Sequence, residues 1–234
     1  PETALESEIP SLPDRKGYNF DGCPPGMLYQ ASVNDGQIVF PGGASYRLLA
    51  LPCFETMTPA LLKKIRDLVS EGATVIGLPP AKSPGLTDFP DCDRQVQSVA
   101  QELWGSSDIP EKMTTRSFGK GKISWGLELK EKGDNLYPHY DIISDILISM
   151  RIPEDFTAKT PIRYTHRTLP DGEIYFIANR TDRELKDDCL FRITGKSPEL
   201  WDPMTGKTRL LPEYSVTDGC TKIPLEFEAH ESYF

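Results

Sequence analysis

The segment from Tyr46 to Pro80, YRLLALPCFETMTPALLKKIRDLVSEGATVIGLPP, constrains the fold more than any other part of this chain. Arg47 to Leu51 is a short, almost continuous apolar run, which is typical of a strand buried on both faces of a parallel sheet. Ala73 to Leu78 repeats this pattern after a helical stretch. The segment therefore predicts a β-α-β crossover, which is right-handed in nearly all known cases.

The helix of this crossover has start and stop signals of its own. Thr58 is placed to cap the N-terminus, Pro59 takes the first helical position, and Gly72 ends the helix. The apolar residues between them follow the spacing of one helical face: Leu61, Leu62, Ile65, Leu68 and Val69.

Similar patterns continue through the first two thirds of the chain. Strands are predicted at Tyr18–Phe20, Gln37–Phe40 and Lys122–Gly126, and helices at Asp93–Trp104 and Tyr140–Met150. Together these elements predict a small, doubly wound, flavodoxin-like α/β domain with a parallel sheet over residues 1–151.

The pattern changes near residue 155. IPEDFTAKTP, residues 152–161, carries two prolines and no sustained periodicity, so we interpret it as a linker. Beyond it, short strands recur about every 8 to 12 residues, separated by Gly, Pro or Asp, which predicts an all-β sandwich over residues 162–234. Within it, Glu199 to Pro212 indicates a β-hairpin, because Pro203 fixes φ and Gly206 allows a positive φ between strands that carry Trp201 and Leu210.

Charge and hydropathy exclude several classes of partner. The net charge is −9, whereas nucleic acids and anionic membranes bind basic faces. No apolar run reaches the roughly 18 residues of a membrane span, and no signal segment is recognisable. From its length and its 38% hydrophobic residues we expect an ordinary soluble protein, and because the chain starts with Pro1 we expect it to be a piece of a longer polypeptide.

The cysteines predict neither a zinc site nor a disulfide framework, because the five of them are widely spaced without a CxxC pair. We expect mostly free, half-buried thiols, and Cys189 with Cys220 is the one pairing considered. The first domain resembles the class I glutamine amidotransferase-like fold, whose nucleophilic cysteine lies at a tight elbow between small residues. Here Pro52 and Phe54 flank Cys53, so a buried structural thiol is the favoured interpretation.

Histidines and carboxylates do not identify a catalytic group. His166 shares a strand face with Tyr164, which favours a partly buried histidine, although a ligand contact is the alternative. Glycoside hydrolysis requires two carboxylates about 5 to 10 Å apart, and no pair stands out in the sequence. We predict no catalytic, metal or cofactor residues.

Aromatic rings are the remaining candidates for contact with a sugar, because a flat ring can stack on a pyranose. The candidates in the second half are Trp201, Tyr164, Tyr175 and Tyr214. Packing in a sandwich core is the favoured interpretation for each. Trp201, Tyr164 and His166 are retained as candidate substrate-binding residues.

An ordered series of segments resembles the C-terminal region of glycoside hydrolase family 106, the α-L-rhamnosidase-like family. These segments are YRLLALP, MTPALLKKIRDLVSEGATVIGLPPAKSPGL, FPDCDRQVQSVAQELWG, GKGKISWG, YTHR, IYFIANR, FRITGKSPELWDPMTG and PLEFEAHESYF. The resemblance implies a large bacterial, periplasmic or extracellular enzyme. It also implies that calcium-assisted, glutamate-based, inverting hydrolysis takes place in a barrel before residue 1, whose catalytic glutamates have no counterpart here.

Three functional hypotheses follow. The first is a non-catalytic C-terminal part that supports the catalytic barrel of the same polypeptide. The second is a carbohydrate-binding module. The third, an independent thiol hydrolase or amidotransferase, depends on Cys53.

Overall fold

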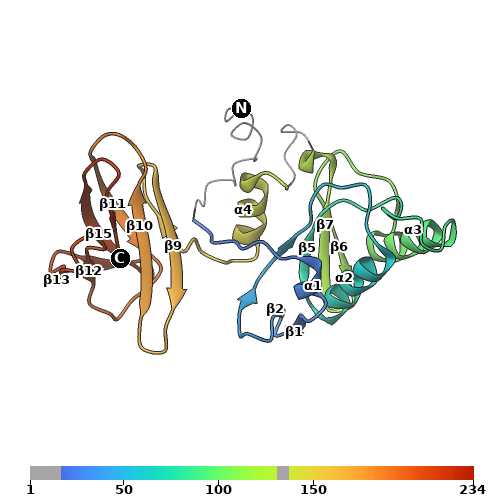
Figure 1. The fold of residues 1–234 in the computed structure, drawn as a ribbon, viewed down its shortest axis with the longest axis horizontal. Helices are drawn as coiled ribbons and strands as arrows, with labels where there is room; N and C mark the ends of the chain where they lie inside the picture. Colours follow the sequence, from blue (N-terminus) through green and yellow to red (C-terminus); the bar gives the residue numbers. More distant parts are fainter. Residues whose placement is uncertain (1–16, 131–136) are drawn as a thin grey trace, which may run out of the picture. The chain divides into compact units, whose positions relative to one another are not determined.

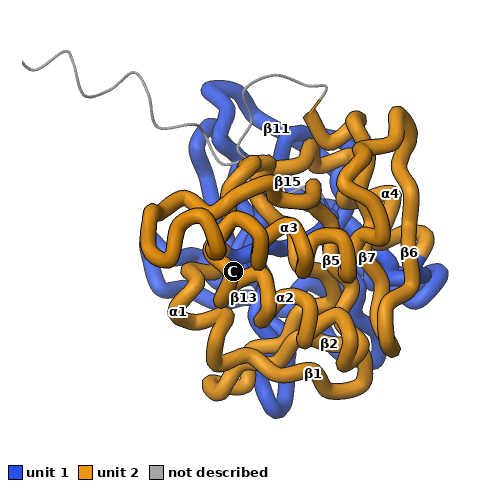
Figure 2. Tube along the Cα trace, turned by 90° about the vertical axis from the view of Figure 1, so that its right-hand side faces the viewer, with its two compact units in different colours: residues 1–21, 150–234 blue, residues 22–149 orange. Residues whose placement is uncertain are grey.

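The computed structural model of the chain describes residues 17–130 and 137–234 (Figure 1). It divides into two compact units, which are described separately. Unit 1 comprises Pro1–Asp21 and Met150–Phe234, and unit 2 comprises Gly22–Ser149 (Figure 2). None of the described helices is both long and apolar enough to cross a membrane.

The main sheet of unit 2 has four strands in the order β4-β5-β7-β6. β4 (Leu49–Ala50), β5 (Thr74–Ile76) and β7 (Gly121–Trp125) are parallel, as the sequence predicts, although the first two are shorter than expected. β6 (Thr114–Phe118) runs antiparallel to β7 at the edge and was not predicted. None of its residues is buried and most are exposed, so its sequence lacks the apolar run of the inner strands.

Three helices accompany this sheet. α2 (Pro59–Glu71) and α3 (Asp91–Trp104) lie on one side of the sheet, and α4 (Tyr140–Ser149) lies on the other (Figure 1). The hydroxyl of Thr58 accepts a hydrogen bond from the Leu61 N–H at 3.4 Å, which confirms the predicted cap. Because helices accompany a sheet with parallel strands, the chain is a mixed α/β protein with many strands. The unit also contains one turn of α-helix, α1 (Pro25–Leu28), and a short 3-10 helix at Leu127–Leu129.

The N-terminal part of the chain differs from the prediction. β1 (Ser32–Asn34), β2 (Gln37–Val39) and β3 (Ser45–Tyr46) form an antiparallel sheet of their own. Asp35 and Gly36 have φ values of 49° and 71°, so they form the tight two-residue turn of a hairpin. Residues 18–20 are not a strand: they belong to unit 1, where the Tyr18 hydroxyl donates to the Ile152 carbonyl at 2.8 Å.

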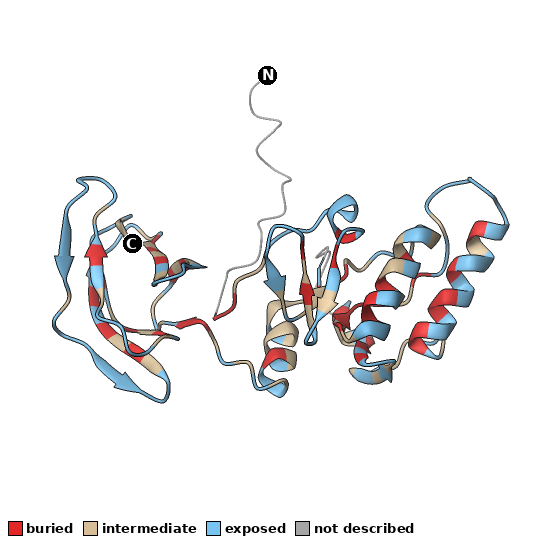
Figure 3. Ribbon diagram, turned by 90° about the horizontal axis from the view of Figure 1, so that it is seen from below, coloured by how far each residue is buried: buried red, intermediate tan, exposed pale blue. Residues whose placement is uncertain are grey.

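The core of unit 2 lies between the sheet and its helices, where the inward faces of α2 and α3 are buried (Figure 3). Trp104, at the end of α3, is 1% exposed, and its indole Nε1 donates to the Gly77 carbonyl at 3.0 Å. The helix ends at Gly105, whose φ of 81° is the left-handed conformation typical of a helix C-terminus.

Unit 1 is built from two antiparallel sheets and a hairpin. One sheet has the order β16 (Ser232–Tyr233), β10 (Glu173–Asn179), β9 (Ile162–Thr168), and the other β14 (Ser215–Thr217), β15 (Cys220–Phe227), β11 (Leu185–Phe191), β8 (Phe156–Thr157). Buried residues alternate along β10, β11 and β15, and both sheets contribute to one hydrophobic core. β8 lies inside residues 152–161, the segment interpreted as a linker. Its Phe156 is 3% exposed and pairs with Phe191 of β11, so this part of the segment belongs to the second sheet and its core.

The predicted hairpin is confirmed. β12 (Glu199–Trp201) pairs with β13 (Thr208–Leu210), and Gly206 has a φ of 69°. The Asp202 carboxylate accepts a hydrogen bond from the Met204 N–H at 2.8 Å, which stabilises the loop from within.

Candidate functional site

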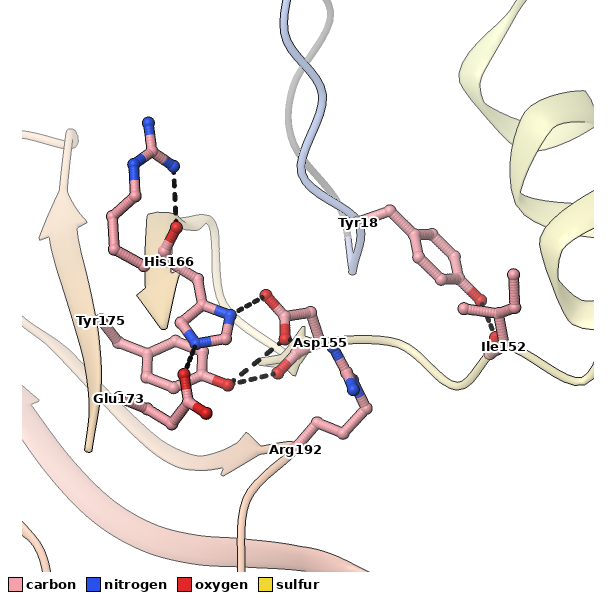
Figure 4. A network of polar contacts seen from close by, with 8 residues as sticks. Tyr18, Ile152, Asp155, His166, Glu173, Tyr175 and Arg192 are labelled. Carbon is pink, nitrogen blue, oxygen red and sulfur yellow. Dashed lines mark hydrogen bonds and ion pairs between the residues drawn. The ribbon is translucent and has the colours of Figure 1, made fainter. Parts of the chain in front are cut away.

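A cluster of polar side chains surrounds His166 in unit 1 (Figure 4). β9 carries His166, and the facing position of β10 carries Tyr175, with Glu173 two residues earlier. Asp155 comes immediately before β8, and Arg192 immediately after β11. Two neighbouring strands and the flanks of two more therefore bring these five side chains together.

Both ring nitrogens of His166 have carboxylate partners. Nδ1 lies 2.8 Å from Oδ2 of Asp155, and Nε2 lies 2.7 Å from Oε2 of Glu173. The side chains of His166 and Asp155 are 12% and 8% exposed, so this contact is largely shielded from solvent. A doubly protonated imidazolium can donate to both carboxylates at once, which neither neutral tautomer can do.

The other carboxylate oxygen of Asp155 is also engaged. Oδ1 accepts a hydrogen bond from Arg192 Nη2 at 2.9 Å and one from the Tyr175 hydroxyl at 3.3 Å. The backbone N–H of Asp155 donates to the Gly17 carbonyl at 2.6 Å. These partners compensate the buried carboxylate of Asp155 for the water that it loses on folding. The backbone hydrogen bond also links residue 17 to the two sheets.

These contacts set the protonation of the cluster. Burial alone would lower the pKa of His166, but hydrogen bonds and charge from Asp155, with a smaller contribution from Glu173, raise it above its ordinary value. Burial, followed by the charge of Asp155, raises the pKa of the Tyr175 phenol well above its ordinary value. The cluster therefore favours the imidazolium form of His166 and the neutral form of the Tyr175 phenol.

The chemistry open to this arrangement is limited. Both nitrogens of His166 are occupied, and one face of its ring stacks on Tyr175 with centroids 4.0 Å apart and planes at 5°. A general base needs a free nitrogen within hydrogen-bond reach of its substrate. The described geometry instead links the strands through His166 and its two carboxylate partners, Asp155 and Glu173, and we call this arrangement the clamp.

We predict a pH dependence from this clamp. A folded pKa that lies above the unfolded value of about 6.5 stabilises the protein fully below that value, and the stabilisation is lost as pH rises through the folded pKa. The free energy of unfolding of unit 1 should therefore fall as pH rises from about 6.5 through the folded pKa, and His166→Gln should flatten this dependence. NMR titration of the His166 ring, together with denaturation at each pH, measures both quantities. A ring that titrates below its ordinary value would contradict the prediction.

The candidate aromatic residues are not brought together. Tyr164, on β9, is 2% exposed and packs against Phe156 with ring centroids 4.9 Å apart, so it is a core residue, as favoured. Tyr175 is also buried. Trp201 lies on β12 and is 54% exposed, and Tyr214 is 40% exposed, so the packing interpretation is wrong for these two. On β12 the buried residue is Leu200, and Trp201, its neighbour, points to the other face.

Cys53 and Cys189 lack the surroundings of a nucleophile. Burial raises the pKa of Cys53, with a smaller opposing effect from Lys130, and its Sγ donates to the Leu129 carbonyl at 3.5 Å. Burial raises the pKa of Cys189 to about 12. Cys189 and Cys220 are both free, so the disulfide that we considered is not formed.

A shallow hollow of about 530 Å³ lies over the second sheet of unit 1. It is lined by Lys159, Lys186, Asp187, Asp188, Glu213, Pro224, Leu225 and Glu226. Its adjacent carboxylates are engaged: Asp187 accepts hydrogen bonds from the N–H and hydroxyl of Thr160 at 2.6 and 2.8 Å, and Asp188 lies 2.7 Å from Lys222. The hollow therefore offers no free pair of these two acids for hydrolysis.

Sequence reasoning missed three members of the His166 cluster: Asp155, Glu173 and Arg192. Asp155 lay in the segment interpreted as a linker, and nothing in its neighbourhood marks it as buried. Glu173 could have been found, because the facing strands IRYTHRT and EIYFIAN place it diagonally from His166 once their turn is centred on LPDG.

Comparisons with known proteins all give glycoside hydrolases. The sequence model of glycoside hydrolase family 106, described as alpha-L-rhamnosidase, matches residues 1–216. A putative beta-glucuronidase from Formosa agariphila is 32% identical over 238 residues, a match that covers 100% of this chain and 18% of that protein. A rhamnosidase structure from Novosphingobium sp. PP1Y matches with a TM-score of 0.71 and 29% identity, over 88% of this chain and 18% of that chain. The chain thus spans less than a fifth of either relative, and it belongs to glycoside hydrolase family 106.

Proposed function

We propose that this chain is a non-catalytic C-terminal region of a larger glycoside hydrolase, in which it supports the catalytic domain. The proposal rests on four acids of the described residues whose carboxylates are bound by other groups of the chain. Asp155 and Glu173 are held by His166, and Asp187 and Asp188 by Thr160 and Lys222. A carboxylate that acts in hydrolysis must reach a water or a leaving group, and these four accept hydrogen bonds or ion pairs from other groups of the chain instead.

The proposal extends to the architecture of each unit. We assign unit 2 to an amidotransferase-like, doubly wound fold without its nucleophile, and unit 1 to a β-sandwich. The parallel strands β4, β5 and β7 support the first assignment, and the core shared by two antiparallel sheets supports the second. The raised pKa of Cys53 argues against the thiol hydrolase alternative. Location in the periplasm or outside the cell is part of the same proposal.

An activity assay tests the proposal. The chain of residues 1–234 should not turn over an aryl α-L-rhamnoside, because the acids gathered around His166 and in the hollow are engaged by other groups, whereas the parent polypeptide with its upstream region should. Hydrogen exchange on the same sample provides the control that both units are folded. Turnover by the folded chain alone would refute the proposal.

Carbohydrate binding is the second candidate, and the exposed indole of Trp201 is the observation that favours it. Calorimetric titration with rhamnose-containing oligosaccharides tests it, with Trp201→Ala as the matched variant. Heats equal to those of dilution would remove this candidate.

A further inference from the structure

The hairpin β12-β13 continues one of the two sheets of unit 1. The Trp201 N–H donates to the Phe234 carbonyl at 2.8 Å, and the Phe234 N–H donates to the Trp201 carbonyl at 2.9 Å. This reciprocal pair of bonds joins residue 201, at the end of β12, to the residue that follows β16. Strands β13, β12, β16, β10 and β9 therefore form one continuous surface.

The register of this surface places aromatic side chains side by side on its outer face. Ile177 pairs with Tyr233, so Phe176 faces Phe234, and their ring centroids are 4.9 Å apart. Phe234 in turn faces Trp201, because directly paired residues point to the same side of a sheet. The opposite face is the core side, which carries Leu200 and Ile177.

The outer face carries exposed apolar side chains beside polar ones such as Glu199, Thr208 and Arg167, whereas a solvated sheet face is normally polar. Trp201 is 54% exposed, Leu210 67%, Phe234 45% and Ile174 39%. Together with Phe176, we call these residues the outer aromatic face. Contiguous apolar surface of this kind on a folded protein marks an interaction site.

The geometry favours a protein surface over a sugar as the occupant. The rings of Phe176 and Phe234 are tilted by 50°, so they share no plane on which a pyranose could stack. The indole Nε1 of Trp201 already donates to the Glu199 carboxylate at 3.1 Å. Exposed aliphatic side chains at Leu210 and Ile174 match the interior of a domain interface better than a polar ligand does.

We propose that the outer aromatic face is the surface on which another domain of the parent polypeptide docks. This rests on the proposed function, in which the chain is one part of a larger glycosidase. More than four fifths of each relative lies outside the matched region, so a large folded surface is available to cover these side chains. The buried centre of the contact is Trp201 with Phe234, flanked by Leu210 and Ile174.

Hydroxyl-radical footprinting of the parent polypeptide and of residues 1–234 tests this proposal. Trp201 should be oxidised several-fold more slowly in the parent than in the 234-residue chain. In the parent, Trp201→Ser with Phe234→Ser should restore oxidation of Leu210 to its rate in the shorter chain. Val216→Ser is the matched control, because Val216 is 56% exposed but lies on β14, in the other sheet, and this change should leave the protection of Trp201 unaltered.

Three results would overturn the proposal. Equal, fast oxidation of Trp201 in both chains would mean that no domain covers it. Equal protection in both would mean that residues 1–234 or a second copy cover it. Protection of the shorter chain only after a rhamnose oligosaccharide is added would make the face a sugar platform. Turnover of a rhamnoside by residues 1–234 would refute the proposed function without changing any of these footprints.

Discussion

Replacing Asp155 with alanine should lower the free energy of unfolding of unit 1 by about 3 kcal/mol, the lower end of the cost of breaking a buried ion pair. The change leaves the His166 imidazolium with Glu173 alone and removes the carboxylate acceptor of Tyr175, whose hydroxyl keeps only the backbone carbonyl of residue 155 at 3.5 Å. We expect the lower end because Glu173 remains and the Arg192 side chain is 43% exposed, so solvent can compensate it. Hydrogen exchange of β9 and β10 under increasing urea measures this effect within unit 1.

Asp188→Ala is the matched control for this substitution. Asp188 is also an aspartate on a strand of unit 1, but it and its partner Lys222 are 50% and 40% exposed. An exposed pair of this kind contributes up to about 1 kcal/mol. If Asp155→Ala destabilised unit 1 no more than Asp188→Ala, the cluster would not be the clamp described above.

Trp104→Ala should lower the free energy of unfolding of unit 2 by about 3–5 kcal/mol, the cost of deleting a large buried aromatic side chain. Trp104 is 1% exposed, and its removal leaves both a cavity beneath α3 and the Gly77 carbonyl without its indole donor. Trp104→Phe keeps most of the packing and loses the hydrogen bond, so it should cost about 1–2 kcal/mol. Exchange of the amides of α3 and β5 reports on this unit.

The control for Trp104 is Phe89→Ala, since Phe89 is 62% exposed in the same unit. Its effect should lie within about 0.5 kcal/mol of zero, as for most surface substitutions. Equal destabilisation by Trp104→Ala and Phe89→Ala would mean that α3 does not pack as described.

The sequence predicts those parts of the fold whose signals are local. The cap at Thr58, the proline after it and Gly72 all lie within one helix, and the structure confirms each of them. The Glu199 to Pro212 hairpin is likewise predicted by local residues, Pro203 and Gly206, in its turn. The edge strand β6 was missed because its sequence, TTRSF, is polar and half-exposed, and its pairing with β7 is what makes it a strand.

The polar cluster could be predicted only in part, because its partners are distant in the chain. Alternation along β9 places His166 on the same face as the buried Tyr164. It does not say that Asp155 and Arg192, 37 residues apart, meet there. That contact depends on the pairing of β8 with β11, which no local pattern shows.

The orientation of Trp201 shows the same limit. In a strand of three residues, a shift of one position exchanges the buried and exposed faces. The pattern ELW is compatible with either Leu200 or Trp201 in the core. The structure buries Leu200, so the hairpin presents its tryptophan to the outside.

We propose that the acids around His166 hold unit 1 together and take no part in hydrolysis. Glu173→Gln in the parent polypeptide tests this proposal, because glutamine keeps the size of the side chain and removes its charge. With folding verified by exchange of β9 and β10, the kcat/KM for an aryl α-L-rhamnoside should be unchanged. A fall of about 10²- to 10⁴-fold, the loss expected for a general acid or base, would contradict the account.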